Sequence, residues 1–393
     1  MSKVYIVAAK RTAIGKFLGT IANVPAADLA ATVIKNILAE TKVDPAKIDE
    51  VIVGNILMAG QKQGVARQAA IKAGIPQEVP AYGLNMICVS GMKSIINAVA
   101  SIKAGDGNLI LAGGTESMSS SGFVMPGTIR NGHKMADLVV MDHMVTDGLT
   151  DAFQGYHMGI TAENIATKYS ITREEQDAFS FGSQQKAAAA IDAGKFKGEI
   201  VPVEIPSKKE TIIFDTDEFV NRSTNLEKLG GLRPAFKKDG TVTAGNASGI
   251  NDGAAFFVMA AADVAAKAGH KAMARVVSYA VAGVPNDVMG EGPIPATKLA
   301  LKKAGLSLDQ MDVIESNEAF AAQALTVMRG LGLDPAKTNP NGGAIALGHP
   351  VGCSGAFIAT KALYELERVG GKYCLVTMCI GGGQGIAVIF ERA

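Results

Sequence analysis

The pattern of apolar residues predicts short buried strands that alternate with amphipathic helices in the first part of the chain. Residues 3–9, 51–58 and 109–112 are nearly continuous apolar runs of the kind that form buried strands. Residues 26–40 and 65–73 carry apolar side chains at helical spacing. Strands and helices that alternate in this way predict an α/β protein with mostly parallel strands, covered by helices on both faces.

The same alternation returns after Gly253 and resembles the first part. Two strand patterns and one turn-to-helix pattern recur: 312–315 repeats 49–53, 373–379 repeats 109–114, and the turn at His349 with its helix 356–368 repeats the turn at Cys88. We therefore predict a duplicated α/β fold. Duplication should bring its two equivalent strand–helix turns to a common interface, where they face each other. Crevices at such strand ends are where open α/β sheets bind ligands.

The stretch between the two halves is more polar and less regular. It contains one clear helix, which begins at the capping box of Thr172 and Glu175 and runs to the alanines at 187–190. We expect this stretch to fold over one face and to carry binding residues. The predicted organisation is a first half (1–118 and 249–272), an inserted loop domain (119–248) and a second half (273–393).

Composition excludes several classes of protein. Of the 393 residues 48% are hydrophobic and 45 are glycine, which suits a compact α/β protein rich in tight turns. A net charge of +1 without a basic run argues against nucleic acid as a partner. The longest apolar stretch, 254–262, is far shorter than the ~20 residues of a membrane span, so we expect no membrane partner. The four cysteines lack the spacing of a disulfide framework or metal site, and together with the absence of a signal peptide they favour a cytoplasmic location.

Cys88 is the first candidate for chemistry. It precedes a predicted helix that extends to residue 104, and Ser90 and Gly91 occupy the positions of an N-cap. A helix N-terminus favours an anion and is one of the environments that lower a thiol pKa from ~8.5. Cys88 is therefore a candidate thiolate nucleophile, although a lone cysteine in this position is more often a small buried residue.

Three further polar residues follow strands or glycine-rich turns in the second half. His349 ends the glycine-rich loop 341–350 and is either a structural residue or the base that deprotonates Cys88. Cys379 precedes three glycines and is either a core residue or a second reactive thiol. Asn317 is a helix N-cap or an anchor for a catalytic water, and Glu318 beside it an ion-pair partner or an orienting group.

Together these segments resemble the thiolase family. Its motifs stand as Asn-x-x-Cys-x-Ser-Gly at 85–91, Asn-Glu-Ala-Phe at 317–320, Gly-His-Pro-x-Gly at 348–352 and Cys-x-Gly-Gly-Gly at 379–383, with a further match at 244–254. The resemblance runs the length of the chain. It implies a five-layered fold with mixed, mostly parallel sheets, and a homotetramer to which the excursion after Ser121 contributes.

The resemblance also implies roles for these residues. Cys88 would attack the thioester of one acyl-CoA, activated by His349. His349 and a water held by Asn317 would form one oxyanion hole, and the backbone N–H groups of Cys88 and Gly381 the other. Cys379 would remove a proton from C2 of acetyl-CoA, so that two acetyl-CoA condense to acetoacetyl-CoA and CoA. CoA thioesters are then substrates, and no cofactor is expected.

Substrate contacts are implied in the same way. His157, Met158 and Met289 would line the acyl pocket and leave room only for short acyl groups, unless the methionines merely fill gaps in the core. CoA would contact the residues Phe236, Ala244, Ser248, Ala319 and Phe320, and also Arg222, which stands one place later than the family pattern leads us to expect. Cys353 occupies a place often held by a smaller residue and is expected to be an inert neighbour of His349.

Two other functions remain open at this point. A degradative 3-ketoacyl-CoA thiolase would carry the same reactive residues with a longer acyl pocket. A non-catalytic CoA- or lipid-binding protein on the same scaffold belongs to a different class, and the joint presence of Cys88, His349, Asn317 and Cys379 argues against it.

Overall fold

The computed structural model describes residues 3–208 and 210–393. The first part forms β1 (Val4–Thr12), β2 (Gly15–Lys16), α1 (Ala26–Thr41), η1 (Pro45–Lys47), β3 (Glu50–Gly54), α2 (Val65–Lys72), β4 (Ala81–Leu84), α3 (Ser90–Ala104) and β5 (Leu109–Ser117). The middle forms β6 (Phe123–Val124), η2 (Gly127–Asn131), β7 (Met141–Asp142), η3 (Met144–Leu149), α4 (Met158–Lys168), α5 (Arg173–Asp192), β8 (Ile200–Val201), β9 (Val203–Ile205), β10 (Ile212–Phe214) and α6 (Leu226–Gly230).

The last part returns to regular strand–helix alternation. It forms β11 (Asn251–Ala261), α7 (Ala262–Lys267), β12 (Ala274–Gly283), η4 (Asn286–Glu291), α8 (Pro293–Ala304), η5 (Leu308–Gln310), β13 (Val313–Ser316), α9 (Ala321–Leu331), α10 (Ala344–Leu347), α11 (Val351–Arg368), β14 (Tyr373–Ile380) and β15 (Gln384–Arg392).

The main sheet shows the duplication directly. Its strand order is β13-β14-β15-β12-β1-β11-β5-β3-β4, with β2 and β8 attached at β11 and β1. In the first half β3 pairs parallel with β5, and β5–β11 and β11–β1 are antiparallel; in the second half β13–β14 is parallel, and β14–β15 and β15–β12 are antiparallel. The duplicated, mixed α/β fold predicted from the sequence is confirmed.

The prediction of mostly parallel pairing is wrong in its proportion. Only residues 381–383 separate β14 from β15, and a connection this short can join antiparallel neighbours but cannot make the crossover that parallel neighbours need. The strand β11 likewise enters from the inserted segment and lies antiparallel between β1 and β5.

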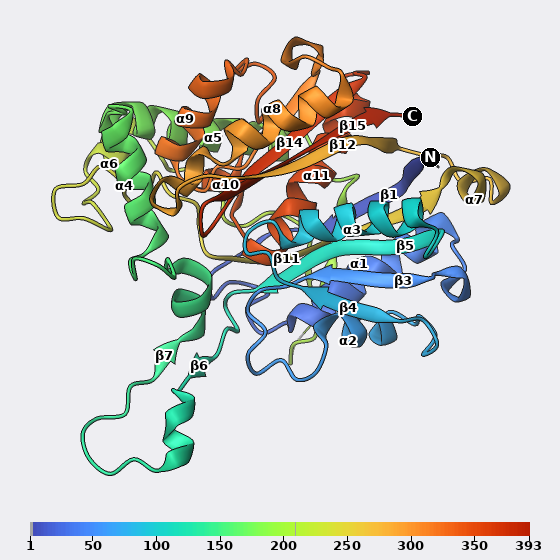
Figure 1. Ribbon diagram of the computed structural model, residues 1–393, viewed down its shortest axis with the longest axis horizontal. Coiled ribbons are helices and arrows are strands. Elements are labelled where there is room, and N and C mark those ends of the chain that lie inside the picture. Colours follow the sequence, from blue (N-terminus) through green and yellow to red (C-terminus); the bar gives the residue numbers. More distant parts are fainter. Residues whose placement is uncertain (1–2, 209) are drawn as a thin grey trace.

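We call the strands β1, β11, β5, β3 and β4 the first half-sheet and the strands β13, β14, β15 and β12 the second half-sheet. These two half-sheets and the helices around them form five layers (Figure 1). The apolar stripe of α1 packs with α2 on the outer face of the first half-sheet, with Leu29 and Val33 completely buried. Between the half-sheets lie α3 and α11, which bury Ile95 and Phe357 in one shared core. Residues of α8 and α9 cover the outer face of the second half-sheet. The central layer therefore brings the helix of each predicted turn into contact with the other.

The stretch Ile87–Ala104, essentially α3, is long and apolar enough to cross a bilayer, judged by its length and composition alone. However, α3 lies in the central layer against α11 and both half-sheets, which is the place of a core helix.

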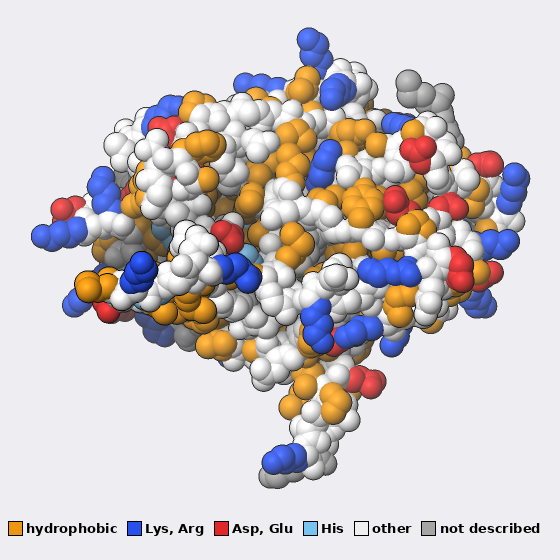
Figure 2. All heavy atoms as spheres, turned by 60° about the horizontal axis from the view of Figure 1, so that its bottom comes forward, with side chains coloured by type: hydrophobic (Ala, Val, Ile, Leu, Met, Phe, Trp, Pro, Cys, Tyr) orange, Lys and Arg blue, Asp and Glu red, His pale blue; other side chains and the backbone are white. Residues whose placement is uncertain are grey.

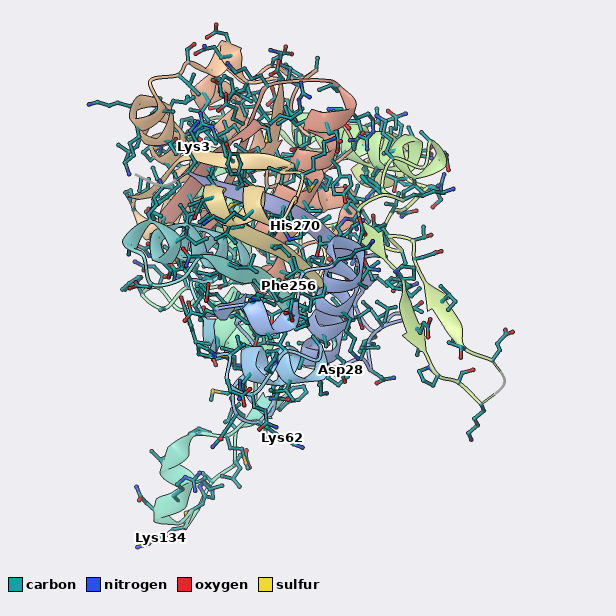
Figure 3. The ribbon with its side chains drawn as sticks, turned by 90° about the vertical axis from the view of Figure 1, so that its right-hand side faces the viewer. Lys3, Asp28, Lys62, Lys134, Phe256 and His270 are labelled. Carbon is teal, nitrogen blue, oxygen red and sulfur yellow. The ribbon has the colours of Figure 1, made fainter. Side chains whose placement is uncertain are left out.

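The inserted segment is more structured than its sequence predicts. The capping box of Thr172 and Glu175 begins α5 as expected, but α4 was not predicted. Within residues 118–142, whose first residue Met118 is still buried in the body, the chain forms an arm that projects and exposes hydrophobic side chains (Figure 2), among them Phe123 at 69% and Met135 at 87%. Lys134 lies near the tip of this arm, and the β9–β10 hairpin projects separately (Figure 3).

Candidate active site

The turn that carries Cys88 is held in a strained conformation by its neighbours. Ile87, a β-branched residue, has φ of +50°, a left-handed conformation that such residues rarely adopt. Asn85 Oδ1 accepts from Ile87 N at 2.9 Å, and Ser90 Oγ accepts from Met86 N at 2.9 Å. The helix α3 then begins at Ser90. These contacts keep Cys88 at the end of the turn, half-buried, directly ahead of the helix.

The turn that carries His349 is held by the first residue of β11, Asn251. The backbone N–H of His349 donates to Asn251 Oδ1 at 2.9 Å, and Asn251 Nδ2 donates to Gly15 O at 3.0 Å. Gly348 has φ of +105°, and a Cβ there would collide with the Asn251 side chain. The motif glycine before the histidine is therefore required both by conformation and by space.

The hydrogen bonds of Ser354 define the tautomer of His349. Ser354 Oγ donates to Pro350 O at 2.9 Å and lies 2.6 Å from His349 Nδ1. Because the single hydroxyl proton is used on Pro350, Nδ1 is assigned as the donor to Ser354 Oγ. Among the described residues Nε2 has no partner, so an unprotonated nitrogen remains available as a base.

Glycines let the two turns approach each other. A Cβ on Gly91, at the start of α3, would lie 3.0 Å from Gly352 O and 3.1 Å from Cys353 O at the start of α11. Val351, two residues after His349, packs in the same apolar cluster as Cys88. The predicted juxtaposition of the two helix N-termini is therefore present.

Cys379 and Gly381 reach the same place from the end of β14. The backbone N–H groups of Gly381 and of Cys88 itself favour the Cys88 thiolate; burial raises the pKa of Cys379, and a negative charge on Cys88 would raise it further. A Cβ on Gly381 would lie 3.3 Å from Ile87 Cγ2 and 3.6 Å from Met158 Sδ. The two thiols are thus electrostatic neighbours.

Burial dominates the electrostatics of the site. It raises the pKa of the Cys88 thiol to about 11, so the expectation of a lowered pKa is wrong for the resting protein. The helix N-terminus and the Gly381 N–H do favour the thiolate, but desolvation outweighs them. Burial also lowers the pKa of His349 to about 4. At rest both groups are therefore uncharged: Cys88 is a thiol and His349 a neutral imidazole.

Asn317 directly follows β13 and is fully buried. Its backbone N–H donates to Thr377 O at 3.0 Å, two residues before Cys379. The alternative of a helix N-cap is wrong, because α9 begins at Ala321 and its N-cap is Phe320. Within the described residues neither Oδ1 nor Nδ2 of Asn317 has a hydrogen-bond partner. A buried amide without protein partners suits binding of a substrate oxygen or a water.

Glu318 orients its neighbours and forms no ion pair within the described part of the chain. It accepts from Ser183 Oγ at 2.7 Å, Asn339 Nδ2 at 2.9 Å and Ile345 N at 3.3 Å. Asn339 also bonds both backbone polar groups of Ser316. This network holds the chain on both sides of Asn317.

An apolar cluster surrounds Cys379. Its buried members include the candidate substrate-binding residues Met158, Met289, Ala319 and Phe320, and Phe236 packs against them. The ring of His157 stacks on Phe236 with centroids 4.6 Å apart, and its Nδ1 accepts from Gly159 N to cap α4. Six of the candidate residues thus lie around one thiol.

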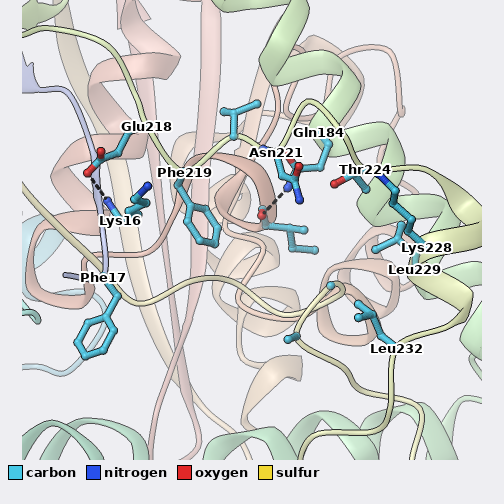
Figure 4. A pocket seen from close by; sticks show the side chains of 14 residues that line it. Lys16, Phe17, Gln184, Glu218, Phe219, Asn221, Thr224, Lys228, Leu229 and Leu232 are labelled. Atoms are coloured by element: carbon cyan, nitrogen blue, oxygen red, sulfur yellow. Dashed lines mark hydrogen bonds between the residues drawn. The ribbon is translucent and has the colours of Figure 1, made fainter. Parts of the chain in front are cut away.

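A cavity of about 710 Å³ is lined by residues of β2, α5 and α6 and of neighbouring loops (Figure 4). Ala244 lines it together with the cationic residues Lys16 and Lys228. From Ala244 the chain runs to Ser248, whose N–H donates to Ala319 O at 2.9 Å in the cluster around Cys379. The segment 244–248 therefore connects the cavity to the thiols.

Arg222 does not line this cavity. Its guanidinium forms an exposed ion pair with Asp192, at 2.7 Å from Nη2 to Oδ1, whereas the preceding Asn221 is a lining residue. The cationic groups of the cavity are the two lysines, and Glu218 lines it as well. The sequence carries no signal for the lysines, because each is a single charge in a short element, β2 or α6.

Ser354 and Glu116 were also missed. A serine five residues after His349 gives a weak signal, and Glu116 lies beyond the strand predicted at 109–112, although β5 extends through it. Cys353 is completely buried beside the His349 turn. Across residues 3–208 and 210–393 no group of three or more His, Cys, Asp or Glu side chains is placed to hold a metal ion.

Comparisons with known proteins agree with the motifs. The chain matches the domains described as "Thiolase, N-terminal domain" over residues 4–263 and "Thiolase, C-terminal domain" over 270–392. The acetyl-CoA acetyltransferases of Pseudomonas aeruginosa and Escherichia coli are 53% and 51% identical to it, each with 100% of both chains covered.

Solved structures superpose closely on the whole chain. The acetyl-CoA acetyltransferase of Bacillus anthracis has a TM-score of 0.97 at 41% identity and covers 100% of this chain and 99% of its own. Human mitochondrial 3-ketoacyl-CoA thiolase in complex with CoA has a TM-score of 0.95 at 45% identity, with 100% and 98% covered. From its motifs, its duplicated five-layered fold and these full-length relatives, the chain belongs to the thiolase family.

Proposed function

We propose that this protein is an acetyl-CoA acetyltransferase, which condenses two acetyl-CoA reversibly to acetoacetyl-CoA and CoA through an acetyl-Cys88 intermediate. The observation that carries the proposal is the meeting of two thiols from opposite halves, where the Gly381 N–H bonds Cys88 and a Cβ on Gly381 would contact both Ile87 and Met158. Within the described residues the buried His349 Nε2 and Asn317 amide have no partner. Relatives of this name at 53% and 51% identity support it.

Acylation uses His349 as base. Nε2 takes the Cys88 proton as Sγ attacks the thioester carbonyl, and the backbone N–H groups of Cys88 and Gly381 stabilise the oxyanion. Loss of one such donor typically costs ~3–4 kcal/mol of transition-state stabilisation. The CoA thiolate leaves and takes the proton of Cys379. Cys88 is then acetylated, His349 is an imidazolium and Cys379 is a thiolate.

Condensation returns every group to its starting state. Cys379 takes a proton from C2 of the second acetyl-CoA, and the enolate oxygen is bound by His349 and by a water held by Asn317. The carbanion attacks acetyl-Cys88, and the expelled Cys88 thiolate recovers its proton from the imidazolium. Acetylation also prevents Cys88 from ionising, and a negative charge there would raise the pKa of Cys379, so Cys379 becomes a thiolate without a like charge beside it. No resident cofactor takes part.

The acyl pocket is proposed to fit short chains. Met158 and Met289 are 8% and 4% exposed and belong to the same apolar cluster as Cys379, so a long acyl chain would have to displace them. CoA is proposed to occupy the cavity lined by Lys16, Lys228 and Ala244, with its pantetheine arm along 244–248 and its phosphates near the lysines.

Acetyl transfer to Cys88 tests the activity. Incubation with acetyl-CoA and peptide mass mapping should find an acetyl group on Cys88 in the wild type and in Cys379→Ala, while only the wild type forms acetoacetyl-CoA. Lack of an adduct on wild-type Cys88 would favour a non-catalytic CoA-binding protein.

Thiolysis rates test the chain length. The wild type should cleave acetoacetyl-CoA much faster than a long-chain 3-ketoacyl-CoA, and Met158→Ala should narrow the difference. Equal wild-type rates on both substrates would favour the degradative 3-ketoacyl-CoA thiolase instead.

We further propose a homotetramer in the cytoplasm. The exposed apolar side chains of the 118–142 arm support association of subunits through it, and four free cysteines suit a reducing compartment. Light scattering should give four subunits, and deletion of the arm should reduce this number.

A further inference from the structure

Glu116 is a completely buried carboxylate at the end of β5, outside the residues assigned to the reaction above. Glu116 is the acceptor in all four of its hydrogen bonds. Oε1 accepts from Asn55 Nδ2 at 2.7 Å and from Leu57 N at 3.2 Å, and Oε2 accepts from Ile56 N and Gly352 N, both at 3.0 Å. No Lys, Arg or His ion pair to it is present in the described part of the chain.

These partners belong to both halves of the fold. Ile56 and Leu57 pack with Cys88 and Val351 in one apolar cluster, so their loop forms a wall of the Cys88 turn. Gly352 lies in the first turn of α11, three residues after His349. A Cβ at Gly352 would collide with Glu116 Oε2, which explains the last glycine of the Gly-His-Pro-x-Gly motif. One carboxylate thus joins the Cys88 wall to the helix that carries His349.

We propose that Glu116 is a positioning residue that fixes the His349 turn against the Cys88 turn, so that Nε2 meets the Cys88 proton at the start of acylation. This inference rests on the proposed acetyl transfer to Cys88. The site demands a group that only accepts hydrogen bonds, because all four neighbours donate. A glutamine in its place turns an N–H₂ group toward backbone N–H donors and loses contact with one side of the interface.

The charge of Glu116 has a second and opposite effect. Burial is the main cause of the raised pKa values of the Cys88 and Cys353 thiols, and the charge of Glu116 raises both further. Burial, together with Asp252 on β11, raises the pKa of Glu116 itself to about 7, so it is largely ionised at pH 8. Removal of the charge therefore favours the Cys88 thiolate while it disturbs the approach of the base. A general loosening of the structure would also speed alkylation, because it would expose the thiol, so the variant that keeps the charge, Glu116→Asp, is needed to separate the two causes.

The test compares Glu116→Gln and Glu116→Asp with Asp312→Asn. Asp312 is a matched control, because its carboxylate also joins two segments by accepting from Lys372 N and Tyr373 N, at the opposite end of the second half-sheet. Quenched-flow mass spectrometry gives the rate of Cys88 acetylation by acetyl-CoA. The rate of Cys88 alkylation by iodoacetamide, measured against pH, gives the intrinsic reactivity of the thiol.

Glu116→Gln should slow acetylation at saturating acetyl-CoA at least tenfold, leave the KM for acetyl-CoA within about threefold, and make alkylation at pH 8 faster than in the wild type. Glu116→Asp keeps the charge but is one methylene shorter, so acetylation should slow while alkylation stays at the wild-type rate. It also carries the test if the glutamine variant does not fold. Asp312→Asn should change neither rate.

Acetylation at the wild-type rate in both Glu116 variants would overturn the inference. Faster alkylation in Glu116→Asp as well as in Glu116→Gln would do the same, since it would indicate a loosened structure that exposes the thiol. Failure of the proposed function is distinguishable, because in that case wild-type Cys88 itself would not be acetylated.

Discussion

The protonation state of Cys88 decides how fast the resting protein reacts with an alkylating agent. Burial raises the pKa of its thiol to about 11 and lowers the pKa of His349 to about 4. Both changes favour uncharged partners. We therefore predict that Cys88 is a neutral thiol at pH 7, in contrast to the thiolate–imidazolium pairs of some other cysteine enzymes.

The size of the effect follows from the pKa. At pH 8 a thiol with a pKa of about 11 is ionised in about one molecule in a thousand. An ordinary cysteine, with a pKa of ~8.5, is ionised in about one in four. Alkylation of Cys88 should thus be roughly two-hundredfold slower than that of an ordinary thiol. Because this whole pH range lies below the pKa, each unit of increasing pH raises the thiolate fraction about tenfold. The alkylation rate should therefore rise about tenfold per unit from pH 6 to 10.

The assay follows iodoacetamide labelling of the Cys88 peptide by mass spectrometry across this pH range. Cys88→Ala reports the background from the three other thiols. His349→Ala should keep the same slope but lose acetylation by acetyl-CoA. A rate that is independent of pH between 6 and 8 would refute the reasoning, since it would indicate a thiolate that already exists at rest.

Three further predictions concern buried contacts. Arg11→Met leaves two buried carboxylates without their cation and should lower the free energy of unfolding by about 3–5 kcal/mol in urea titrations. Ser354→Ala removes the hydrogen bond that keeps the proton of His349 on Nδ1. It should reduce kcat, at most by the ~10²–10⁴-fold that general-base catalysis contributes, with KM nearly unchanged. Gly91→Ala should reduce kcat by crowding α11, whereas Gly182→Ala, which meets nothing within 4 Å, should stabilise the fold by ~1 kcal/mol at full activity.

The sequence predicted those parts of the fold that depend on local pattern. Apolar runs and helical stripes located β1, α1, α2 and β5, and the capping box located α5. Element ends were less accurate where tertiary contacts define them. The strand β3 ends at Gly54 and not at residue 58, because the N–H groups of Ile56 and Leu57 donate to the Glu116 side chain and not to a neighbouring strand.

The start of α11 was missed for a related reason. Glycines at 352 and 355 weaken local helix propensity, so the helix was expected from residue 356. Both glycines are required by the neighbour, since a Cβ on Gly355 would lie 2.5 Å from Met92 N in α3. The resulting shift places His349 only two residues before the helix. Close packing of helices, which no single stretch of sequence encodes, determined this boundary.

The electrostatics of the site were the least predictable feature, because they depend on burial from both halves. Position before a helix suggested a low pKa for Cys88, yet the second half encloses the turn and desolvates the thiol. The same burial that makes each single charge costly strengthens the attraction between two opposite charges. A thiolate and an imidazolium formed together in turnover are therefore far less costly than either alone. The buried site thus keeps both thiols neutral at rest. In the proposed reaction, acylation of Cys88 by acetyl-CoA then forms the imidazolium and the thiolate together.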